Sequence, residues 1–246
     1  MKKQLIALFF ASLAGVFGSL PAGAAGGGYA LERAPIDTHD VVSLQAGART
    51  FVNYCLNCHG AQFMRYNRLG DLGLTEAQIK DNLMFASEKV GETMKIAMTA
   101  ADAKAWFGAP PPDLTVIARA RGADWLYTYL RTFYRDPKTA TGWNNAVFPN
   151  VGMPHALWGL QGEKSLQTVA AAEGQAAEQK WSTLSRGTQS TAQYDTTVRD
   201  LVNFMVWMGE PAANSRRQIG VVVLYVLGIL YLLAYAMKRE FWKDVH

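Results

Sequence analysis

The chain has 246 residues, of which half are hydrophobic, and a formal net charge of +4 at pH 7. Residues 25–210 carry 17 lysines and arginines against 18 aspartates and glutamates, so the basic excess lies at the two ends, which argues against a nucleic-acid-binding protein. The roughly 185 residues between the ends are enough for one domain with a sizeable core, and they show no internal repeat.

The N-terminal residues have the features of a secretory signal peptide. Two lysines follow the initiator, an apolar run spans residues 5–20, and small residues at 22–25 offer a cleavage site of the A-x-A type. We therefore predict a signal peptide at 1–24 and a mature chain that begins near Ala25. An uncleaved membrane anchor is the alternative, but the run is short and is interrupted by glycine and serine.

The only two cysteines of the chain lie in Cys55-Leu56-Asn57-Cys58-His59, at the end of a helix predicted over Ser43–Asn57. A C-x-x-C-H sequence is typical of covalent c-type haem attachment, because two thiols three residues apart can reach two vinyl groups of the porphyrin. The next histidine then provides an axial ligand to the iron. We therefore predict one haem c per chain, attached through Cys55 and Cys58, with His59 as the proximal ligand.

Two other functions of a C-x-x-C pair agree less well with the sequence. A structural zinc site needs four ligands, and the remaining histidines, His39, His155 and His246, have no ligand-like spacing. A redox disulfide of the thioredoxin type follows a strand, whereas the residues before Cys55 have a helical pattern. The redox disulfide remains the main alternative to haem.

Most methionines lie in segments with helical periodicity. Beyond the first helix, the predicted helices are Thr75–Val90, Glu92–Phe107, Leu114–Ala120, Ala123–Phe133 and Asp195–Met208. Their apolar faces include Met84, Met94, Met98, Met205 and Met208. We expect these methionines to pack in the core and not to bind iron.

Met153 differs because its surroundings cannot be helical. Residues 148–154 read Phe-Pro-Asn-Val-Gly-Met-Pro and are rich in turn formers. A methionine held in a rigid Gly-Met-Pro loop can present its sulfur to iron, so we predict that Met153 is the sixth ligand. His155 and an open sixth position are the alternatives that the residues leave.

A second hydrophobic segment closes the chain. Residues 219–237 contain no charge and as a helix would be about 29 Å long, which matches the roughly 30 Å hydrocarbon core of a bilayer. We predict a single transmembrane anchor at 218–237 and a cytoplasmic tail at 238–246. The short basic tail suits the cytoplasmic side, because the domain before the anchor is exported.

Further segments share one resemblance when they are taken in order. They are Cys55–Gly60 followed by Phe63, Tyr66 and Leu69; Pro111–Leu114; Arg119–Arg121; Phe148–Met153; and Met237–Arg239 with Trp242. C-x-x-C-H alone would indicate only a c-type cytochrome. Together the segments resemble the cytochrome c1 family, the haem subunit of the bacterial cytochrome bc1 complex, over nearly the whole mature chain.

The resemblance implies an all-α fold, with a periplasmic cytochrome c-type haem domain with loop insertions at 25–210 and one C-terminal transmembrane helix. In such domains the C-x-x-C-H helix crosses the last helix. We therefore expect Phe51 and Tyr54 to lie near Phe204 and Trp207.

The resemblance also assigns residues at the edge of the haem. Pro111 and Pro112 would line one edge, where proline adds no unpaired N–H group to an apolar pocket. Arg121 would pair with a haem propionate, for which its guanidinium fork is suited. From the residues alone, Arg119 and Arg121 would be a solvated turn.

The chain departs from the family in two places. Trp125 stands where the family more often has an aromatic hydroxyl near the propionates, and an indole can donate a hydrogen bond but not accept one. Residues 162–193 are polar and longer than a compact cytochrome requires, and we expect a helix plus a loop there. No acidic segment for docking a soluble cytochrome stands out, so electrostatic steering of the acceptor should be modest.

Histidine and methionine together would fill both axial positions, so the haem would pass single electrons and not bind oxygen or peroxide. The resemblance implies that the Rieske iron–sulfur protein is the donor, a soluble or tethered cytochrome c the acceptor and cytochrome b the membrane partner. The setting would be the ubiquinol–cytochrome c reductase complex, a dimer in the bacterial inner membrane. The chain would be its electron-transfer subunit, with no complete reaction of its own.

Three other functions share some of these features. A free-standing membrane-anchored c-type cytochrome, or a cytochrome c subunit of a terminal oxidase, would also carry C-x-x-C-H and one anchor, although Pro111–Leu114 with Arg121 argues against both. A haem peroxidase or sensor would need an exchangeable sixth position. A thiol oxidoreductase would carry no haem.

Overall fold

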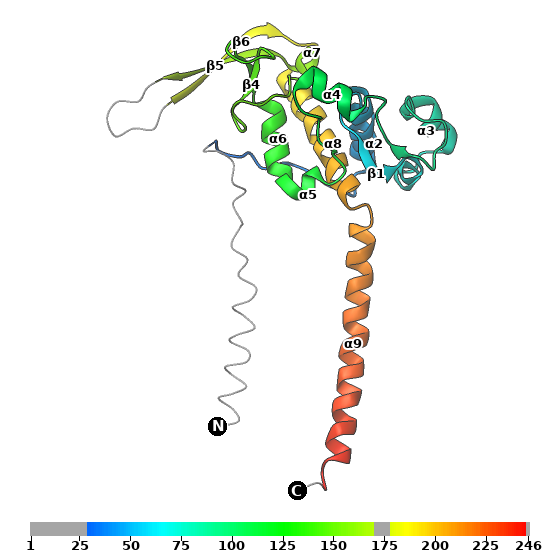
Figure 1. Cartoon of the computed structure of the whole chain (residues 1–246). Helices are drawn as coiled ribbons and strands as arrows, with labels where there is room; N and C mark the ends of the chain where they lie inside the picture. Colours follow the sequence, from blue (N-terminus) through cyan, green and yellow to red (C-terminus); the bar gives the residue numbers. More distant parts are fainter. Residues whose placement is uncertain (1–28, 170–177, 245–246) are drawn as a thin grey trace.

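The computed structural model describes residues 29–169 and 178–244, so the predicted signal peptide at 1–24 lies outside the described residues. A largely helical domain lies at one end of the long helix α9 (Ala213–Phe241), which extends away from it (Figure 1). In the described part, three two-stranded antiparallel sheets accompany the helices. The predicted helical fold is therefore confirmed, with small sheets added to it.

The centre of the domain is the crossing of α2 (Val41–Thr50) and α8 (Thr191–Gly209). Gly47 lies at the crossing, and a Cβ atom there would be 2.0 Å from the carbonyl oxygen of Asp200. Only glycine lets the two helices approach so closely. The ring centroids of Phe51 and Phe204 are 5.6 Å apart, as expected, whereas Tyr54 is exposed.

The first helix begins two residues earlier than predicted, because the Asp40 side chain caps it by accepting from the Ser43 amide. A π-helical turn, η1 (Phe51–Cys55), follows α2 directly. Such wide turns occur mostly as short insertions in α-helices, frequently at functional sites. Here the turn ends at Cys55, the first residue of the C-x-x-C-H sequence.

Two predicted helices are shorter than expected. The helix α3 (Glu76–Leu83) begins behind its Thr75 cap but ends early, because the next residues run beside the 3-10 helix η2 (Tyr66–Leu72). There the amides of Tyr66 and Asn67 donate to the carbonyls of Glu92 and Val90.

The strands β1 (Ala61–Arg65) and β2 (Thr93–Met94) pair, so the helix predicted to begin at Glu92 starts only at α4 (Ala100–Phe107). Met94 is buried as predicted, but it lies in a strand.

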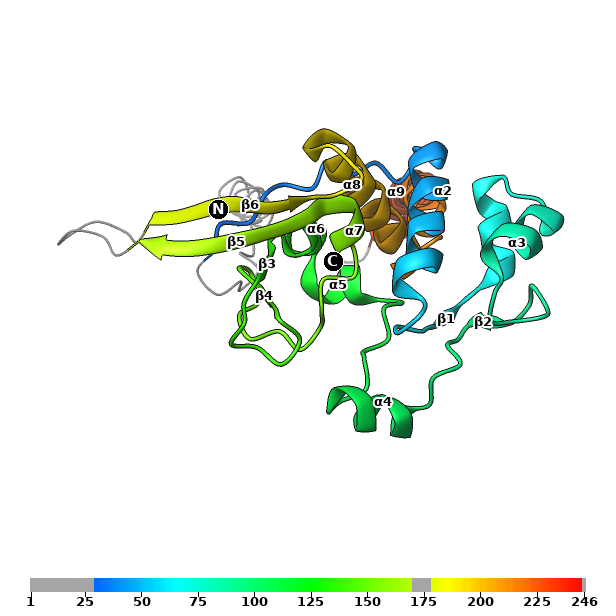
Figure 2. The same ribbon diagram turned by 90° about the horizontal axis from the view of Figure 1, so that it is seen from above.

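The prediction of a helix and a loop within residues 162–193 is wrong, because the described part of this range forms two paired strands. The strands β5 (Gly162–Val169) and β6 (Glu178–Arg186) pair as an antiparallel hairpin that extends away from the domain (Figure 2). At the base of the hairpin Gly162 has φ +87°, and a Cβ atom there would lie 2.3 Å from the carbonyl oxygen of Ser185. Packing of Trp181 against Tyr134, at 6.2 Å between ring centroids, holds the hairpin to the domain.

The remaining elements are α5 (Ile117–Arg121), α6 (Ala123–Arg131), β3 (Phe133–Arg135), β4 (Trp143–Asn145) and α7 (Trp158–Gln161). Of these, α5 and α6 lie close to the predicted helices, whereas β3, β4 and α7 were not predicted. The helix α8 begins four residues earlier than predicted, because Ser190 and Gln193 form a capping box. Met84, Met205 and Met208 are buried in the core, as expected.

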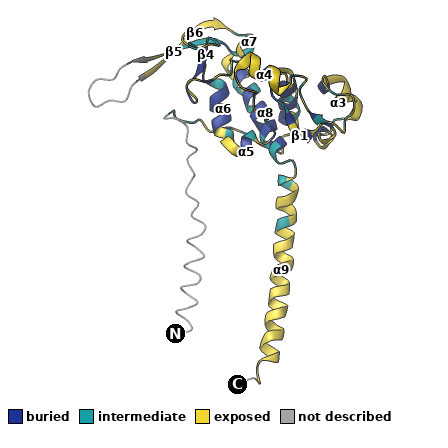
Figure 3. Ribbon diagram, viewed as in Figure 1, coloured by how far each residue is buried: buried dark blue, intermediate teal, exposed yellow. Residues whose placement is uncertain are grey.

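The helix α9 contains the predicted anchor. Its most apolar 18-residue window has a mean hydropathy of 2.4, and none of that window is buried by the rest of the described chain. Figure 3 shows this contrast, with exposed residues along α9 and buried ones in α2, α6 and α8. Among the described helices, α9 alone is long and apolar enough to cross a membrane.

Candidate haem site

The C-x-x-C-H residues project from one turn at the end of η1. The amides of Cys58 and His59 donate to the carbonyl of Cys55 at 3.1 and 2.9 Å. Both cysteines are free and partly exposed. Burial raises the pKa of the Cys55 thiol to about 12, so it stays protonated, whereas a redox C-x-x-C pair lowers the pKa to favour the thiolate. A protonated thiol argues against thiol exchange at this pair.

His59 is buried and its ring is oriented by one hydrogen bond. Its Nδ1 lies 2.8 Å from the carbonyl oxygen of Pro112. A carbonyl oxygen can only accept, so Nδ1 carries the proton and Nε2 keeps a free lone pair in the neutral ring. Burial lowers the pKa of His59 and so favours that neutral form. A metal-ligating histidine typically has this arrangement.

The proline turn lies beside the attachment residues. Pro112 supplies the carbonyl that orients His59, and Pro111 is half-buried. The next residue fixes the turn: the Asp113 carboxylate accepts from the amide of Gln62 at 2.7 Å and from the hydroxyl of Thr115 at 2.6 Å. The segment from Pro111 is thereby held against the residues that follow C-x-x-C-H.

The loop that carries Met153 is held by two buried asparagines at the end of β4. The Asn145 Oδ1 accepts from the amides of Val147 and Phe148 at 2.9 and 3.1 Å, and the Asn144 Oδ1 accepts from the amide of Asn150 at 2.8 Å. Sequence reasoning missed both asparagines. The pair of asparagines directly before a run of turn formers was the available signal.

Met153 is half-buried, and its sulfur accepts a hydrogen bond from the Tyr129 hydroxyl at 3.4 Å. His155, the alternative ligand, is enclosed by the core: its Nε2 lies 2.8 Å from the Gln161 side-chain oxygen, and its ring stacks on Phe133 at 4.8 Å. Burial lowers the pKa of His155 to about 4. The surroundings therefore favour Met153 over His155 as an iron ligand.

Arg121 lies next to the Met153 loop. Its guanidinium is 5.1 Å from the ring of Trp125 and 5.7 Å from the ring of Phe148, which belongs to the loop. Within residues 29–169 and 178–244 Arg121 forms no ion pair, so its charge is available to an external carboxylate. Trp125 in turn stacks on Tyr129, with 4.7 Å between ring centroids.

The predicted residues thus form two groups. One contains Cys55, Cys58, His59, Pro111 and Pro112, and the other contains Arg121 and Met153 with their aromatic neighbours. A neutral imidazole with a free Nε2, a thioether fixed in a loop, two free thiols and an unpaired guanidinium are the groups that a histidine–methionine haem c needs. The residues present therefore fit this cofactor.

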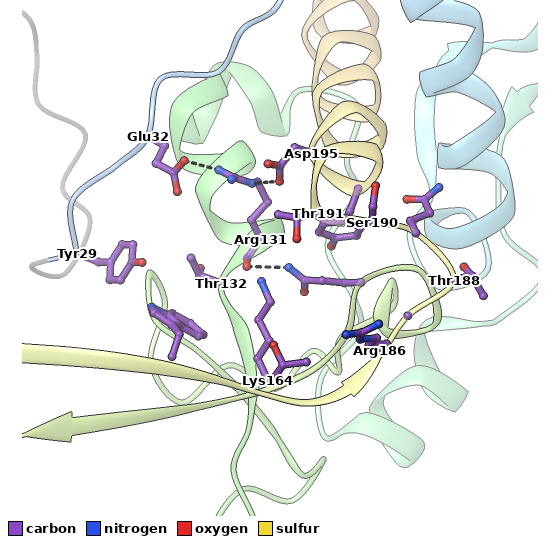
Figure 4. A pocket seen from close by; sticks show the side chains of 16 residues that line it. Tyr29, Glu32, Arg131, Thr132, Lys164, Arg186, Thr188, Ser190, Thr191 and Asp195 are labelled. Carbon is purple, nitrogen blue, oxygen red and sulfur yellow. Dashed lines mark hydrogen bonds and ion pairs between the residues drawn. The ribbon is translucent and has the colours of Figure 1, made fainter.

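A cavity of about 720 Å³ lies elsewhere, between the C-terminal end of α6, the base of the hairpin and the start of α8 (Figure 4). Arg131 bridges two carboxylates in it, those of Glu32 and Asp195. Lys164 also lines it, and burial lowers the pKa of that lysine. None of the described residues that line the cavity is a cysteine, histidine or methionine, so its chemistry does not suit haem.

Comparisons with known proteins show the family of the chain. The model of the Cytochrome C1 family matches residues 31–245. The chain is 50% identical over 216 residues to the "Ammonia monooxygenase gamma subunit" of Nitrosomonas europaea, which covers 88% of this chain and 89% of that protein. It is 48% identical over 226 residues to the cytochrome c1 of Allochromatium vinosum (91% and 93% covered) and 28% identical over 244 residues to that of Rhodospirillum rubrum (84% and 83%).

Proposed function

The chain belongs to the cytochrome c1 family, and from this premise we propose that His59 and Met153 are the two axial ligands of its haem. Family membership makes the protein an electron carrier of the cytochrome bc1 complex that binds haem c. The spacing of Cys55 and Cys58 is that of the C-x-x-C-H attachment motif. A free-standing cytochrome or an oxidase subunit gains no support from the comparisons.

The observation that carries the ligand proposal is the pair of hydrogen bonds behind the two donor atoms. Pro112 fixes the His59 tautomer that leaves Nε2 free, and Tyr129 holds the Met153 sulfur from the side of the core. Each ligand thus has a partner that fixes its orientation, as metal ligands in proteins usually do.

These residues determine what the site does. When bound, haem supplies a one-electron couple. A thioether ligand favours the ferrous state and so raises the reduction potential, and ligands on both sides exclude oxygen and peroxide. The unpaired Arg121 would neutralise a propionate, because its charge has no carboxylate partner in the described chain.

The partners follow from the same proposal. The Rieske iron–sulfur protein would be the donor, a cytochrome c the acceptor, and cytochrome b would pack against the uncovered faces of α9 in a dimeric complex. Arg216 and Arg217 precede the apolar part of α9, and Lys238, Arg239 and Lys243 follow it. Because the predicted signal peptide would export the domain, we place the haem domain on the periplasmic side and the more basic tail on the cytoplasmic side. Copurification of tagged chain with cytochrome b and the Rieske protein tests this assignment.

The ligand proposal is tested by absorption spectra of membranes that contain wild type or Met153→Leu, each reduced and then exposed to carbon monoxide. We expect a low-spin c-type spectrum in wild type that carbon monoxide does not change, and a carbon monoxide adduct in Met153→Leu. Met84→Leu is the matched control, because Met84 is buried in the core. Carbon monoxide binding by wild type would show that the sixth position is open.

A further inference from the structure

We propose that Tyr129 is a positioning residue that raises the haem potential by donating a hydrogen bond to the Met153 sulfur. The inference rests on the proposed role of Met153 as a ligand and adds a residue that tunes it. The Tyr129 hydroxyl lies 3.4 Å from the Met153 Sδ, which is a normal separation for a hydrogen bond to the larger sulfur atom.

The hydroxyl has no other use in the described part of the chain. Tyr129 is only 8% exposed, and the Met153 sulfur is the one hydrogen-bond partner of its side chain there. A buried phenol usually finds a strong acceptor such as a carbonyl, as Tyr194 does at 2.8 Å from the carbonyl oxygen of Leu130.

The ring cannot easily turn away from the sulfur. Trp125 stacks on one face with 4.7 Å between centroids and an interplanar angle of 12°, and Phe133 contacts the ring edge-on at 5.0 Å. The Asn145 Nδ2 donates to the Tyr129 carbonyl at 2.7 Å, and the same side chain holds the amides of the Met153 loop. One asparagine therefore fixes the donor and the acceptor to a common frame.

The expected effect follows from the electron density on sulfur. A thioether has two lone pairs, so one can bind iron while the other accepts from Tyr129. A donor at the second lone pair withdraws electron density, which weakens donation to ferric iron more than to ferrous iron and favours the reduced state. Since a single hydrogen bond has a modest net effect, we expect a roughly threefold shift in the redox equilibrium. At 59 mV for a tenfold change, this shift is about 28 mV.

The test is a redox titration of the intact complex that carries wild type or Tyr129→Phe, which removes the hydroxyl and keeps the ring. We expect the reduction potential of the haem to be about 28 mV lower in Tyr129→Phe than in wild type, which corresponds to the threefold shift in the redox equilibrium. The matched control is Tyr194→Phe, which removes another buried hydroxyl and its hydrogen bond, and its potential should equal that of wild type. An unchanged potential in Tyr129→Phe would overturn the inference.

A second measurement needs no variant. Resonance Raman spectra of the purified full-length wild-type chain with its haem, separated from the Rieske protein, in H₂O and D₂O should show an isotope shift of the stretch between iron and the Met153 sulfur, because that sulfur accepts an exchangeable proton. No shift would overturn the role of Tyr129. Carbon monoxide binding by wild type separates the two failures: an open site refutes Met153 as a ligand, whereas a closed site with an unchanged potential refutes only the role of Tyr129.

Discussion

Tyr129 and Arg131 are two positions apart on α6 and have opposite surroundings. Tyr129 lies between aromatic rings and donates to the Met153 sulfur, whereas Arg131 lines the polar cavity and pairs with Glu32 and Asp195. Two positions on an α-helix are roughly 200° apart, so the two side chains leave opposite faces. One short helix thus separates a contact that tunes the redox site from one that ties the domain together.

The two faces should affect different properties. The aromatic face acts on a single atom, the Met153 sulfur, so changes there should appear in the potential. The charged face joins Glu32 of the N-terminal segment to Asp195 at the start of α8, so changes there should appear in the stability of the domain. Substitutions can break or sharpen this division.

The largest expected effect is at Gly47, where the crossing of α2 and α8 would be disturbed. In Gly47→Ala the new Cβ would lie 2.0 Å from the Asp200 carbonyl oxygen, so α8 would have to move away from α2. We expect a loss of about 3 kcal/mol or more in the free energy of unfolding. Thermal or denaturant unfolding of the purified protein measures it.

Gly70→Ala is the matched control, because a Cβ atom at Gly70 would meet nothing within 4 Å. If Gly47→Ala unfolded like Gly70→Ala, close approach of the two helices would not be what organises the domain.

Arg131→Met should have an intermediate effect that is confined to stability. The substitution leaves two carboxylates without their shared partner, at an expected cost of about 1 to 3 kcal/mol in unfolding free energy. The potential should stay at the wild-type value. Arg119→Met removes a more exposed ion pair with Glu210 and should cost less than about 1 kcal/mol. A potential shift in Arg131→Met would contradict the division between the two faces.

The smallest effect is expected at Lys164, and it depends on pH. Burial is the main cause that lowers the pKa of this lysine in the folded protein, and repulsion from Arg131 is the second. The unfolded chain therefore holds the proton more strongly. The stability of wild type should therefore rise with pH between the lowered pKa and the ordinary value near 10.5.

Lys164→Met should remove that rise and be slightly more stable at neutral pH, by less than about 1 kcal/mol. Unfolding curves recorded at several pH values compare the two proteins. A Lys164→Met protein with the wild-type slope would place the proton uptake on another group.

The sequence predicts the parts of the site that depend on local patterns. C-x-x-C-H and the Gly-Met-Pro loop are short motifs, and the helices α6 and α8 were predicted within a few residues of their ends. Local spacing was enough because each of these features is formed by neighbours in the chain. The Pro111–Leu114 turn was assigned only through the family resemblance.

The parts that were missed depend on contacts between distant residues. The alanine, glutamine and glutamate of residues 162–193 favour a helix locally, but pairing of β5 with β6 and packing on β3 determine a hairpin. β2 likewise exists only because it pairs with β1. The hydrogen bond from the Tyr129 hydroxyl to the Met153 sulfur, 24 residues away in the chain, leaves no periodic signal in the sequence.

The central claim is that the Met153 sulfur is bound to iron. Extended X-ray absorption fine structure at the iron K edge tests this claim directly, because it identifies the atoms bound to iron and their distances. In the purified full-length chain that carries its haem, separated from the Rieske protein and cytochrome b, we expect one sulfur neighbour of iron in wild type and none in Met153→Leu, since the thioether sulfurs of Cys55 and Cys58 bind the porphyrin and not the metal. A wild-type iron surrounded by nitrogen or oxygen alone would contradict the claim.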